Sequence, residues 1–385
     1  MMPSSFDVAI VGGGPGGSAT ALSLRAHAPS LSVVLIEGSH YEALRIGETL
    51  PPPVRPILEH LGVWMTFQKE DHREVHGTTA VWGSAAALDN DFIYMPSSTG
   101  WHVDRAAFDA MLAAEANLKG AAITLDTRVH DVKRAGNEWR LTLSTGNNLA
   151  ARFIVDATGA AGLARLCGAR FVEADCLIGI AGFFEYSSGD PRTIVEACED
   201  GWWYTAGLPD GRRIIACMTD ADLARRMRLR ETEEWRRRLA AMPHVGAMAR
   251  RSHLCSPLVV RAAASRRLEP AAGEYWLAVG DSASRFDPLS SQGIVKALRS
   301  GIFGSYAISD LLTRDDDSGL DRYRRYVFEE FESYAEVRTK YYREEQRWPQ
   351  SEFWRRRHTT IDDPRRWIDS KARGIPASAE ILAEA

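Results

Sequence analysis

A glycine-rich turn near the start of the chain has the spacing of a dinucleotide-binding site, Gly12-x-Gly14-x-x-Gly17. It follows the apolar run 7–11, which is short enough for a buried parallel strand, and precedes the Ala- and Leu-rich stretch 18–27, which is typical of a helix. Gly12 permits a tight turn, Gly14 lets a pyrophosphate approach the backbone, and Gly17 allows the helix to pack closely on the strand. The helix N-terminus supplies N–H donors and a partial positive charge to the phosphates.

Glu37 ends the next β-branched run, 31–36, and follows Gly17 by twenty residues. A carboxylate at this spacing accepts hydrogen bonds from the hydroxyls of an adenosine ribose. The turn and Glu37 together predict a dinucleotide site, but they leave NAD and FAD both open. The residues assigned to this site are Gly12, Gly14, Pro15, Gly16, Gly17 and Glu37.

Later segments favour FAD. Residues 156–159 and the pair Gly280-Asp281 each follow an apolar run, and Pro288 precedes the turn 291–294. In this order they resemble the second and third FAD contact regions of the p-hydroxybenzoate hydroxylase-like flavoproteins. The resemblance implies that Asp281 binds the ribityl chain, and that a helix N-terminus beside the ring stabilises negative charge on reduced flavin. The contacts it implies are Asp156, Gly159, Gly280, Asp281, Pro288, Gln292, Gly293 and Ile294.

Two further motifs resemble the flavin-dependent halogenase branch of that superfamily. Residues 45–49 resemble its IGE(S/T) segment, and residues 101–109 resemble its WxVdRxxFD helix start. The likeness extends over roughly residues 5–310. It implies that Arg45 and Arg105 reach FAD, because a guanidinium fork suits phosphate oxygens. A solvated surface position is the alternative for Arg45.

The chain departs from the halogenases in two places. Their lysine near the flavin, a few residues ahead of a Trp, has no counterpart in 76–82, and the nearest lysines are Lys69 and Lys119. Their WxWxIP motif keeps only its outline in 201–209. Because a halogenase captures hypohalous acid with that lysine, the resemblance then implies direct hydroxylation of an aromatic ring through a flavin C4a-hydroperoxide.

Three segments, 201–222, 280–293 and 346–356, resemble flavoproteins that accompany quinone-cofactor oxidases and amine dehydrogenases. Members of that group hydroxylate a tryptophan side chain of a partner protein and so begin tryptophylquinone formation. The resemblance implies an FAD-dependent monooxygenase with a similar substrate, O₂ as co-substrate, and reduced flavin or NAD(P)H as electron source. The alternatives are a halogenase, a small-molecule aromatic hydroxylase, a prenyl-chain reductase, and an FAD-binding assembly partner without turnover.

Glu48, His76 and Trp203 are the candidate catalytic residues. Glu48 could assist proton transfer, although a backbone contact is an equally simple role for it. His76 could act as a base or donor near the flavin, or as a structural histidine. Trp203, together with Trp202 and Tyr204, could line an aromatic substrate pocket or pack in a core, since such residues dominate cores.

Three surface features predict an open approach for a protein substrate. They are the aromatic residues 202–204, the Arg-rich stretch 225–238, and the Trp- and Arg-rich segment 346–357. Trp and Arg are the residue types that dominate protein–protein interfaces. We expect these regions to frame a cleft that leads to the flavin, although arginine-rich helices are also common as solvated faces.

The elements that position these motifs predict an α/β fold. A Rossmann-like FAD-binding domain, an interleaved β-sheet substrate domain and a C-terminal helical region account for the alternation of strand and helix patterns. The FAD-binding domain is expected over 5–75, 101–175 and 266–312, the substrate domain over 76–100 and 176–265, and the helical region over 313–385.

Composition excludes several classes. With 385 residues, 45% of them apolar, the chain is long enough for two or three packed domains. A net charge of −4 favours neither nucleic acid nor an anionic membrane surface. No apolar run reaches the roughly 18–20 residues of a membrane span. Five scattered cysteines show neither a disulfide framework nor metal-ligand spacing, so we expect a cytoplasmic protein without metal.

Overall fold

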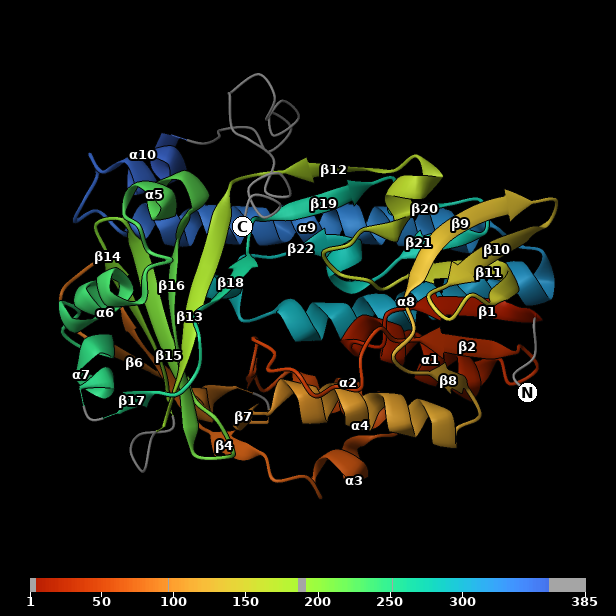
Figure 1. The fold of residues 1–385 in the computed structure, drawn as a ribbon, viewed down its shortest axis with the longest axis horizontal. Helices are drawn as coiled ribbons and strands as arrows, with labels where there is room; N and C mark the ends of the chain where they lie inside the picture. The colour runs from red at the N-terminus through yellow and green to blue at the C-terminus, as the bar shows by residue number, and fades with distance from the viewer. Residues whose placement is uncertain (1–4, 96, 186–191, 251, 360–385) are drawn as a thin grey trace.

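The structure is a computed structural model that describes residues 5–95, 97–185, 192–250 and 252–359. Two large sheets lie at opposite ends of the elongated molecule, and long helices run between them (Figure 1). This arrangement confirms the predicted α/β fold with a Rossmann-like unit, a second sheet and a helical C-terminal region. Within the described residues, no helix is both long enough and apolar enough to span a bilayer.

The first sheet has a parallel centre in the order β21-β11-β1-β2-β8. Its central strand is apolar on both faces because other parts of the molecule cover both of them, and Val8, Ala9 and Ile10 are fully buried. Strands β20, β10 and β9 extend the sheet in antiparallel fashion. The strands are β1 (Ser5–Val11), β2 (Val33–Ile36), β8 (Ala122–Thr124), β9 (Val129–Ala135), β10 (Glu138–Leu143), β11 (Asn148–Asp156), β20 (Ala272–Gly273) and β21 (Trp276–Ala278).

The carboxyl ends of β1, β11 and β21 meet at one edge of this sheet. The loops that follow them carry the three motifs expected to bind the cofactor, at 12–17, 156–159 and 280–281. Ligands of open α/β sheets bind outside the carboxyl ends of the strands. Parallel pairing therefore brings together segments that lie more than 100 residues apart in the chain.

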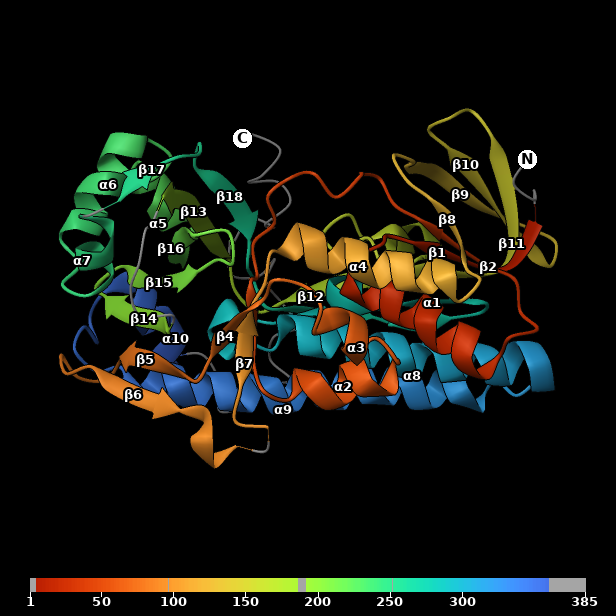
Figure 2. The same ribbon diagram turned by 90° about the horizontal axis from the view of Figure 1, so that it is seen from below.

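Helices pack closely around this edge. Helix α1 lies against α8, where a Cβ on Gly301 would stand 2.4 Å from the carbonyl oxygen of Gly16. Figure 2 shows α1, α4 and α8 beside the first sheet, with α2 and α3 on the same side. The helices of this part are α1 (Pro15–His27), α2 (Val54–His60), α3 (Trp64–Phe67), α4 (Arg105–Leu118) and α8 (Gly293–Arg314).

The second sheet is largely antiparallel, in the order β17-β13-β16-β15-β14-β5-β6, with β18 also paired to β13. Both of its faces are covered, so it separates two apolar clusters. Its strands are β5 (Gly77–Val81), β6 (Leu88–Asp91), β13 (Leu177–Glu185), β14 (Thr193–Cys198), β15 (Gly201–Gly207), β16 (Arg212–Asp220), β17 (His253–Leu254) and β18 (Val259–Ala262).

Two small three-stranded sheets join the large ones. One has the order β12-β19-β22 and the other the order β3-β7-β4, and all their pairings are antiparallel. Their strands are β3 (Thr49–Leu50), β4 (Arg73–Val75), β7 (Gly100–His102), β12 (Arg170–Glu173), β19 (Arg266–Glu269) and β22 (Ser284–Arg285).

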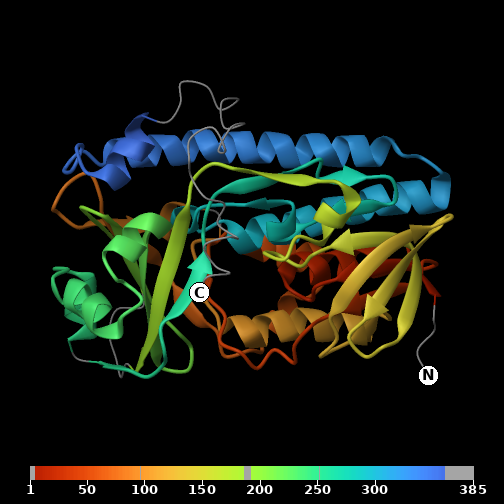
Figure 3. The same ribbon diagram turned by 45° about the horizontal axis from the view of Figure 1, so that its top comes forward.

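Helix α9 (Ser318–Glu344) runs along the molecule from the first sheet to the second (Figures 1 and 3). Its first half buries Tyr323 and Val327 in the core of the first sheet, and its last turns bury Tyr342 against the second sheet. The helix therefore ties the two ends of the molecule together. The sequence prediction for residues beyond 359 lies outside the described residues.

The C-terminal helix α10 (Glu352–Thr359) corrects one expectation. Trp354 is fully buried and packs 5.9 Å from the ring of Tyr342, while Arg356 and Arg357 form ion pairs with Asp220. Trp354, Arg356 and Arg357 thus make contacts within the molecule. None of the residues 346–357 lines the cavity described below. Buried Trp side chains and ion-paired arginines occur inside a fold as well as at interfaces, so the sequence pattern could not tell the two apart.

The Arg-rich stretch 225–238 corrects a second expectation. It forms α5 (Ala221–Arg226) and the start of α6 (Thr232–Ala240), and α7 (Val245–Ala249) follows. Trp235 packs α6 against Trp203, on the face of the second sheet that the cavity does not use. Arg228 pairs with Glu231, and Arg238 with Glu234. No residue of this stretch lines the cavity, and Trp235 and Leu239 of α6 belong to the opposite cluster, so the stretch does not frame the cavity.

Candidate active site

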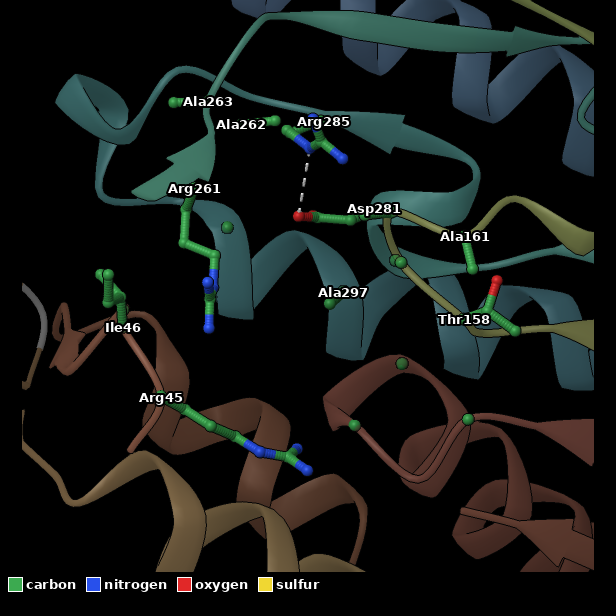
Figure 4. Close-up of a pocket in the computed structure, with 18 of the residues that line it drawn as sticks. Arg45, Ile46, Thr158, Ala161, Arg261, Ala262, Ala263, Asp281, Arg285 and Ala297 are labelled. Carbon is green, nitrogen blue, oxygen red and sulfur yellow. Dashed lines mark ion pairs between the residues drawn. The ribbon is translucent and has the colours of Figure 1, made fainter. Parts of the chain in front are cut away.

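A continuous cavity of about 2340 Å³ runs from the glycine turn to the second sheet. The three loops at the edge of the first sheet line one end, and β13 to β16 line the other. Figure 4 shows its middle part, where Arg45 and Arg261 point toward the open space from opposite sides. The volume exceeds the roughly 300–1,000 Å³ of an ordinary ligand pocket, so it has room for a large cofactor and a second molecule.

The glycine turn is closed on one side and open on the other. Gly12 has φ +110°, and a Cβ there would stand 2.3 Å from the carbonyl oxygen of Ala157. A Cβ on Gly17 would stand 2.0 Å from the carbonyl oxygen of Gly12. A Cβ on Gly14 would meet nothing within 4 Å, because this glycine faces the cavity. Gly14 caps α1 without any side-chain hydrogen bond, and the first N–H groups of the helix fit a phosphate.

Five of the six residues assigned to the dinucleotide line the cavity, and Gly17 instead packs the helix on the turn. Glu37 is held in place by three hydrogen bonds to its carboxylate, one of them from Arg45 Nη2 to Oε1 at 3.3 Å. Its Oε2 accepts the N–H of Gly13 at 2.7 Å, and its Oε1 accepts the Ser39 hydroxyl at 2.5 Å. The carboxylate therefore has a fixed orientation at the adenosine end of the cavity.

Arg45 and Arg105 both line the cavity and share one buried carboxylate. Arg45 Nη1 lies 2.7 Å and Arg105 Nη2 3.2 Å from Asp109 Oδ2. Arg105 also donates to the carbonyl oxygens of Ile46 and Gly47 at 3.0 and 3.2 Å. It thereby holds the 45–49 segment against the cavity. The sequence motif contained Asp109, but its role as the shared anchor follows only from the packing of α4.

The loop after β11 is ordered by Asp156, which does not itself line the cavity. Its carboxylate accepts the N–H of Thr158 at 3.0 Å and the hydroxyl of Ser282 at 2.9 Å. Asp156 therefore joins the second and third motif loops and positions them. Gly159 and Gly280 do line the cavity.

Asp281 lines the cavity with its side chain 45% exposed. Lys296 Nζ lies 2.9 Å and Arg285 Nε 3.7 Å from this carboxylate. Although burial acts to raise it, these two cations hold the pKa of Asp281 below its usual range. The carboxylate is thus ionised and available as an acceptor for hydroxyl groups, as the ribityl assignment requires.

The start of α8 contributes Pro288, Gly293 and Ile294 to the lining. A Cβ on Gly293 would meet nothing within 4 Å, so the helix N-terminus opens to the cavity. Gln292, which was expected to contact the cofactor, is exposed and does not line the cavity, whereas its neighbours Ser291 and Gly293 do. Asp287, which the sequence did not single out, lines the cavity and accepts the N–H of Leu289 at 3.0 Å.

Alternation along β15 decides which aromatic residues face the cavity. Trp202 and Tyr204 line it, while Trp203 points to the other face and packs 5.1 Å from Trp235. The candidate role of Trp203 in catalysis is therefore wrong, because neighbouring side chains of a strand point in opposite directions. Because side chains alternate along a strand, Trp202 and Tyr204 must share one face of β15. The alternation does not show whether that face or the face of Trp203 is turned toward the cavity.

His76 is also corrected. It lies between β4 and β5, its side chain is 67% exposed, and its Nε2 is 3.9 Å from Glu74. It does not line the cavity. His76 lies next to the halogenase-like segment in the sequence, but not beside the cavity in the fold. It directly precedes Gly77, which pairs with Asp91 in β6 at the edge of the second sheet.

Glu48 is 2% exposed and lines the cavity near Tyr204. Its Oε2 accepts the N–H of Gly47 at 3.0 Å. Burial raises the pKa of this carboxyl above its ordinary value, and the two backbone contacts and Arg105 only partly offset the shift. A buried carboxyl with a raised pKa is a candidate for proton transfer.

A polar group missed by the sequence lies beside Glu48. His102 Nε2 is 2.9 Å from the Thr193 hydroxyl, which is 3.4 Å from the Thr49 hydroxyl. Thr49 and Thr193 line the cavity. Burial and the nearby Arg213 lower the pKa of His102 to about 3, so its ring is neutral. The register of β3 on β7 brings Thr49 and His102 opposite each other, which only the fold could reveal.

No lysine is among the described residues that line the cavity. Outside it, ligand atoms of Cys176, Asp220 and Asp222 lie within 4.8 Å of one another. The two carboxylates are already paired with Arg356, and burial raises the pKa of the Cys176 thiol. This cluster is an ion-pair network of the fold.

Comparisons with known proteins agree with this geometry. The family model described as tryptophan halogenase matches residues 7–76 and 64–372. The chain is 29% identical over 363 residues to the putative FAD-dependent oxidoreductase LodB of Marinomonas mediterranea, with 92% of this chain and 97% of that protein covered.

Two solved structures share the fold. The myxobacterial chondrochloren halogenase CndH has a TM-score of 0.85 and 23% identity, over 96% of this chain and 90% of that chain. The peptidyl tryptophan dihydroxylase QhpG, essential for tryptophylquinone cofactor biogenesis, has a TM-score of 0.75 and 24% identity, over 92% and 78%.

These findings confirm the predicted FAD cofactor and the predicted oxidoreductase class. FAD fits the cavity. The glycine turn leaves the N-terminus of α1 open to a phosphate, and the far end of the cavity has room for a second molecule. The chain belongs to the tryptophan halogenase family of FAD-dependent enzymes.

Proposed function

We propose that the protein is an FAD-dependent monooxygenase that hydroxylates the indole ring of a tryptophan in a partner protein. The observation that carries the proposal is the far end of the cavity. There Trp202 and Tyr204 form an aromatic wall beside the buried Glu48, and no lysine lines the cavity within the described residues. The fold shared with a peptidyl tryptophan dihydroxylase supports the choice of an indole in a chain.

When bound, FAD supplies the oxygen chemistry. The protein binds the cofactor through the glycine turn and Asp281, and it orients the substrate ring against Trp202 and Tyr204. Aromatic faces hold an indole by offset or edge contacts while excluding water. The carboxyl of Glu48, whose pKa is raised by burial, lies where it can exchange a proton with the substrate end of the cavity.

Halogenation is the second candidate, favoured by the family match and by the similarity to CndH. A halogenase must hold an electrophilic halogen between flavin and substrate. The described cavity offers no amine for that purpose, which favours hydroxylation. Halide dependence separates the two candidates.

The experiment is mass spectrometry of a partner chain after aerobic incubation with the FAD-loaded enzyme and a source of reduced flavin. The partner is the precursor of a tryptophylquinone oxidase or amine dehydrogenase, used both folded and as an unfolded peptide. We expect a gain of oxygen on one tryptophan, with and without chloride or bromide. A halogen on the product contradicts the proposal, and so does hydroxylation of free tryptophan without any change in the partner.

A further inference from the structure

Two arginines face each other in the cavity wall. Arg266 in β19 and Arg285 in β22 are register partners in antiparallel strands, and both line the cavity. They are 5% and 6% exposed. Like charges directly opposite each other destabilise a sheet, and burial removes the water that would screen them. On its other side, Arg266 is the register partner of Glu173 in β12, so a carboxylate opposes it there and a guanidinium opposes it in β22.

Each guanidinium keeps a donor without a partner among the described residues. These are Nε of Arg266 and Nη1 of Arg285. The Arg266 group is otherwise fixed, because its Cζ lies 3.6 Å over the ring of Phe171 and its Nη2 donates to Gly159 at 3.2 Å. A buried donor without an acceptor lowers the stability of the fold by its full desolvation penalty. Such donors in a cavity wall therefore indicate a ligand that accepts their hydrogen bonds.

Cations and carboxylates both lie near the two arginines. Asp281 is the carboxylate beside Arg285, and it is already engaged by Lys296 at 2.9 Å. Burial and the neighbouring Arg285 lower the pKa of Arg266 to about 10, although Glu173 and Asp281 act in the opposite direction. These carboxylates offset much of the positive charge, so it is the unpartnered donors of the two arginines that favour an anion here.

This position differs from the phosphate-binding turn. Figure 4 shows Arg285 beyond Asp281 as seen from the ribbon of the glycine turn, and Arg261 of β18 points toward the same space from the second sheet. An anion bound here would lie between the two ends of the cavity, where a reactant enters beside FAD.

We propose that Arg266 and Arg285 form an oxyanion subsite that binds a phosphate or carboxylate group of the molecule that reacts with FAD. One oxyanion between the two guanidiniums accepts both free N–H groups and neutralises the repulsion between the charges. The anion belongs either to a reduced nicotinamide dinucleotide or to a substrate with a carboxylate near its aromatic ring. The subsite does not depend on whether that ring is hydroxylated or halogenated.

Binding to the FAD-loaded enzyme tests the subsite. The probes are NAD⁺ and NADP⁺, which cannot reduce the flavin, and a tryptophan peptide with an adjacent Asp compared with its Asn counterpart. Binding is followed by the change in flavin absorbance. The variants are Arg266→Gln and Arg285→Gln. The control is Arg170→Gln, which removes a cavity arginine that is 70% exposed and pairs with Glu269.

We expect at least one anionic probe to bind, and each subsite variant to weaken it about ten- to hundredfold, as the loss of a charged hydrogen bond predicts. Binding of a nucleotide identifies the electron donor as the source of the anion, and a preference for the Asp peptide identifies the substrate. The control should change affinity by less than about threefold. The proposal is overturned if no probe depends on the two arginines, or if both variants lose FAD to the same degree.

Stability gives a second readout. Removing one of two opposed charges relieves repulsion, so each variant should unfold at a Tm equal to or above that of the native protein without added anion. A lower Tm for both variants would show that the guanidiniums stabilise the fold by themselves, and it would overturn the proposal.

Discussion

The indole Nε1–H of Trp202 donates a hydrogen bond to the hydroxyl of Tyr342 at 3.1 Å, which links the cavity wall to the last turns of α9. Tyr342 in turn donates to Oδ2 of Asp287 at 2.8 Å, and Arg338 lies 3.1 Å from the same oxygen. Asp287 precedes the Pro288 turn at the start of α8. One buried hydroxyl thus sets both the aromatic wall and the turn beside the expected flavin ring.

Tyr342→Phe tests this link. The change leaves the Trp202 N–H without its acceptor and removes one of the two donors to Asp287 Oδ2, which keeps Arg338, so we expect the unfolding free energy to fall by about 1–3 kcal/mol. We also expect KM for the substrate to rise, because Trp202 loses its fixed orientation. Chemical denaturation and steady-state kinetics measure both effects. Tyr341→Phe is the matched control, since that side chain is 52% exposed. Equal behaviour of the two variants would contradict the link.

Trp202→Phe should reduce activity, whereas Trp203→Phe should reduce stability. Trp202 lines the cavity, so its variant should lose kcat/KM while retaining FAD. Trp203 lies in the opposite cluster, so its variant should lose about 1–3 kcal/mol of stability and keep its activity per folded molecule. Activity normalised to bound FAD separates the two effects. A loss of normalised activity in Trp203→Phe would show that the assignment of faces is wrong.

Gly14→Val should prevent FAD binding, whereas Gly17→Ala should impair folding. A side chain on Gly14 extends into open cavity, so Gly14→Val should fold with a native circular dichroism spectrum and lose FAD, because the pyrophosphate can no longer reach the backbone. A Cβ on Gly17 would stand 2.0 Å from the backbone of Gly12, so the smaller change should reduce the yield of folded protein. Full flavin occupancy in Gly14→Val would refute the placement of the phosphates.

Glu48→Gln should stabilise the protein increasingly as pH rises. The pKa of Glu48 in the folded protein lies above the ordinary value of 4.5. Below pH 4.5 the carboxyl is protonated in both the folded and the unfolded state, so folding buries no charge at this position. As pH rises through the folded pKa, the native protein must bury an ionised carboxylate, and the variant does not. Each unit of pKa shift corresponds to about 1.4 kcal/mol.

Thermal unfolding between about pH 4 and pH 8 checks this prediction for Glu48. The Tm of Glu48→Gln minus that of the native protein should grow toward high pH. Glu42→Gln, which changes an exposed carboxylate in the same segment, is the control. A difference for Glu48→Gln that stays constant over the whole range would show that folding does not shift the pKa of this carboxyl, and it would contradict the prediction.

The sequence by itself determined the cofactor end of this protein. The glycine spacing 12–17, the carboxylate at Glu37 and the strand-end motifs at 156–159 and 280–281 are local patterns. Each one specifies a turn or a strand end on its own, and the rule that parallel strands bind ligands at their carboxyl ends places them together. The α/β fold followed for the same reason, because apolar periodicity is a local property.

Only the tertiary structure decided the substrate end. Both faces of the second sheet are buried, so the apolar sequence of β15 could not tell whether Trp202 or Trp203 faces the cavity. The pairing of Trp202 with Tyr342 spans 140 residues, and the opposition of Arg266 and Arg285 depends on strand register. Such contacts form between segments whose local patterns carry no information about each other. Packing alone makes them neighbours, and packing equally removes His76 and the segment 346–357 from the site.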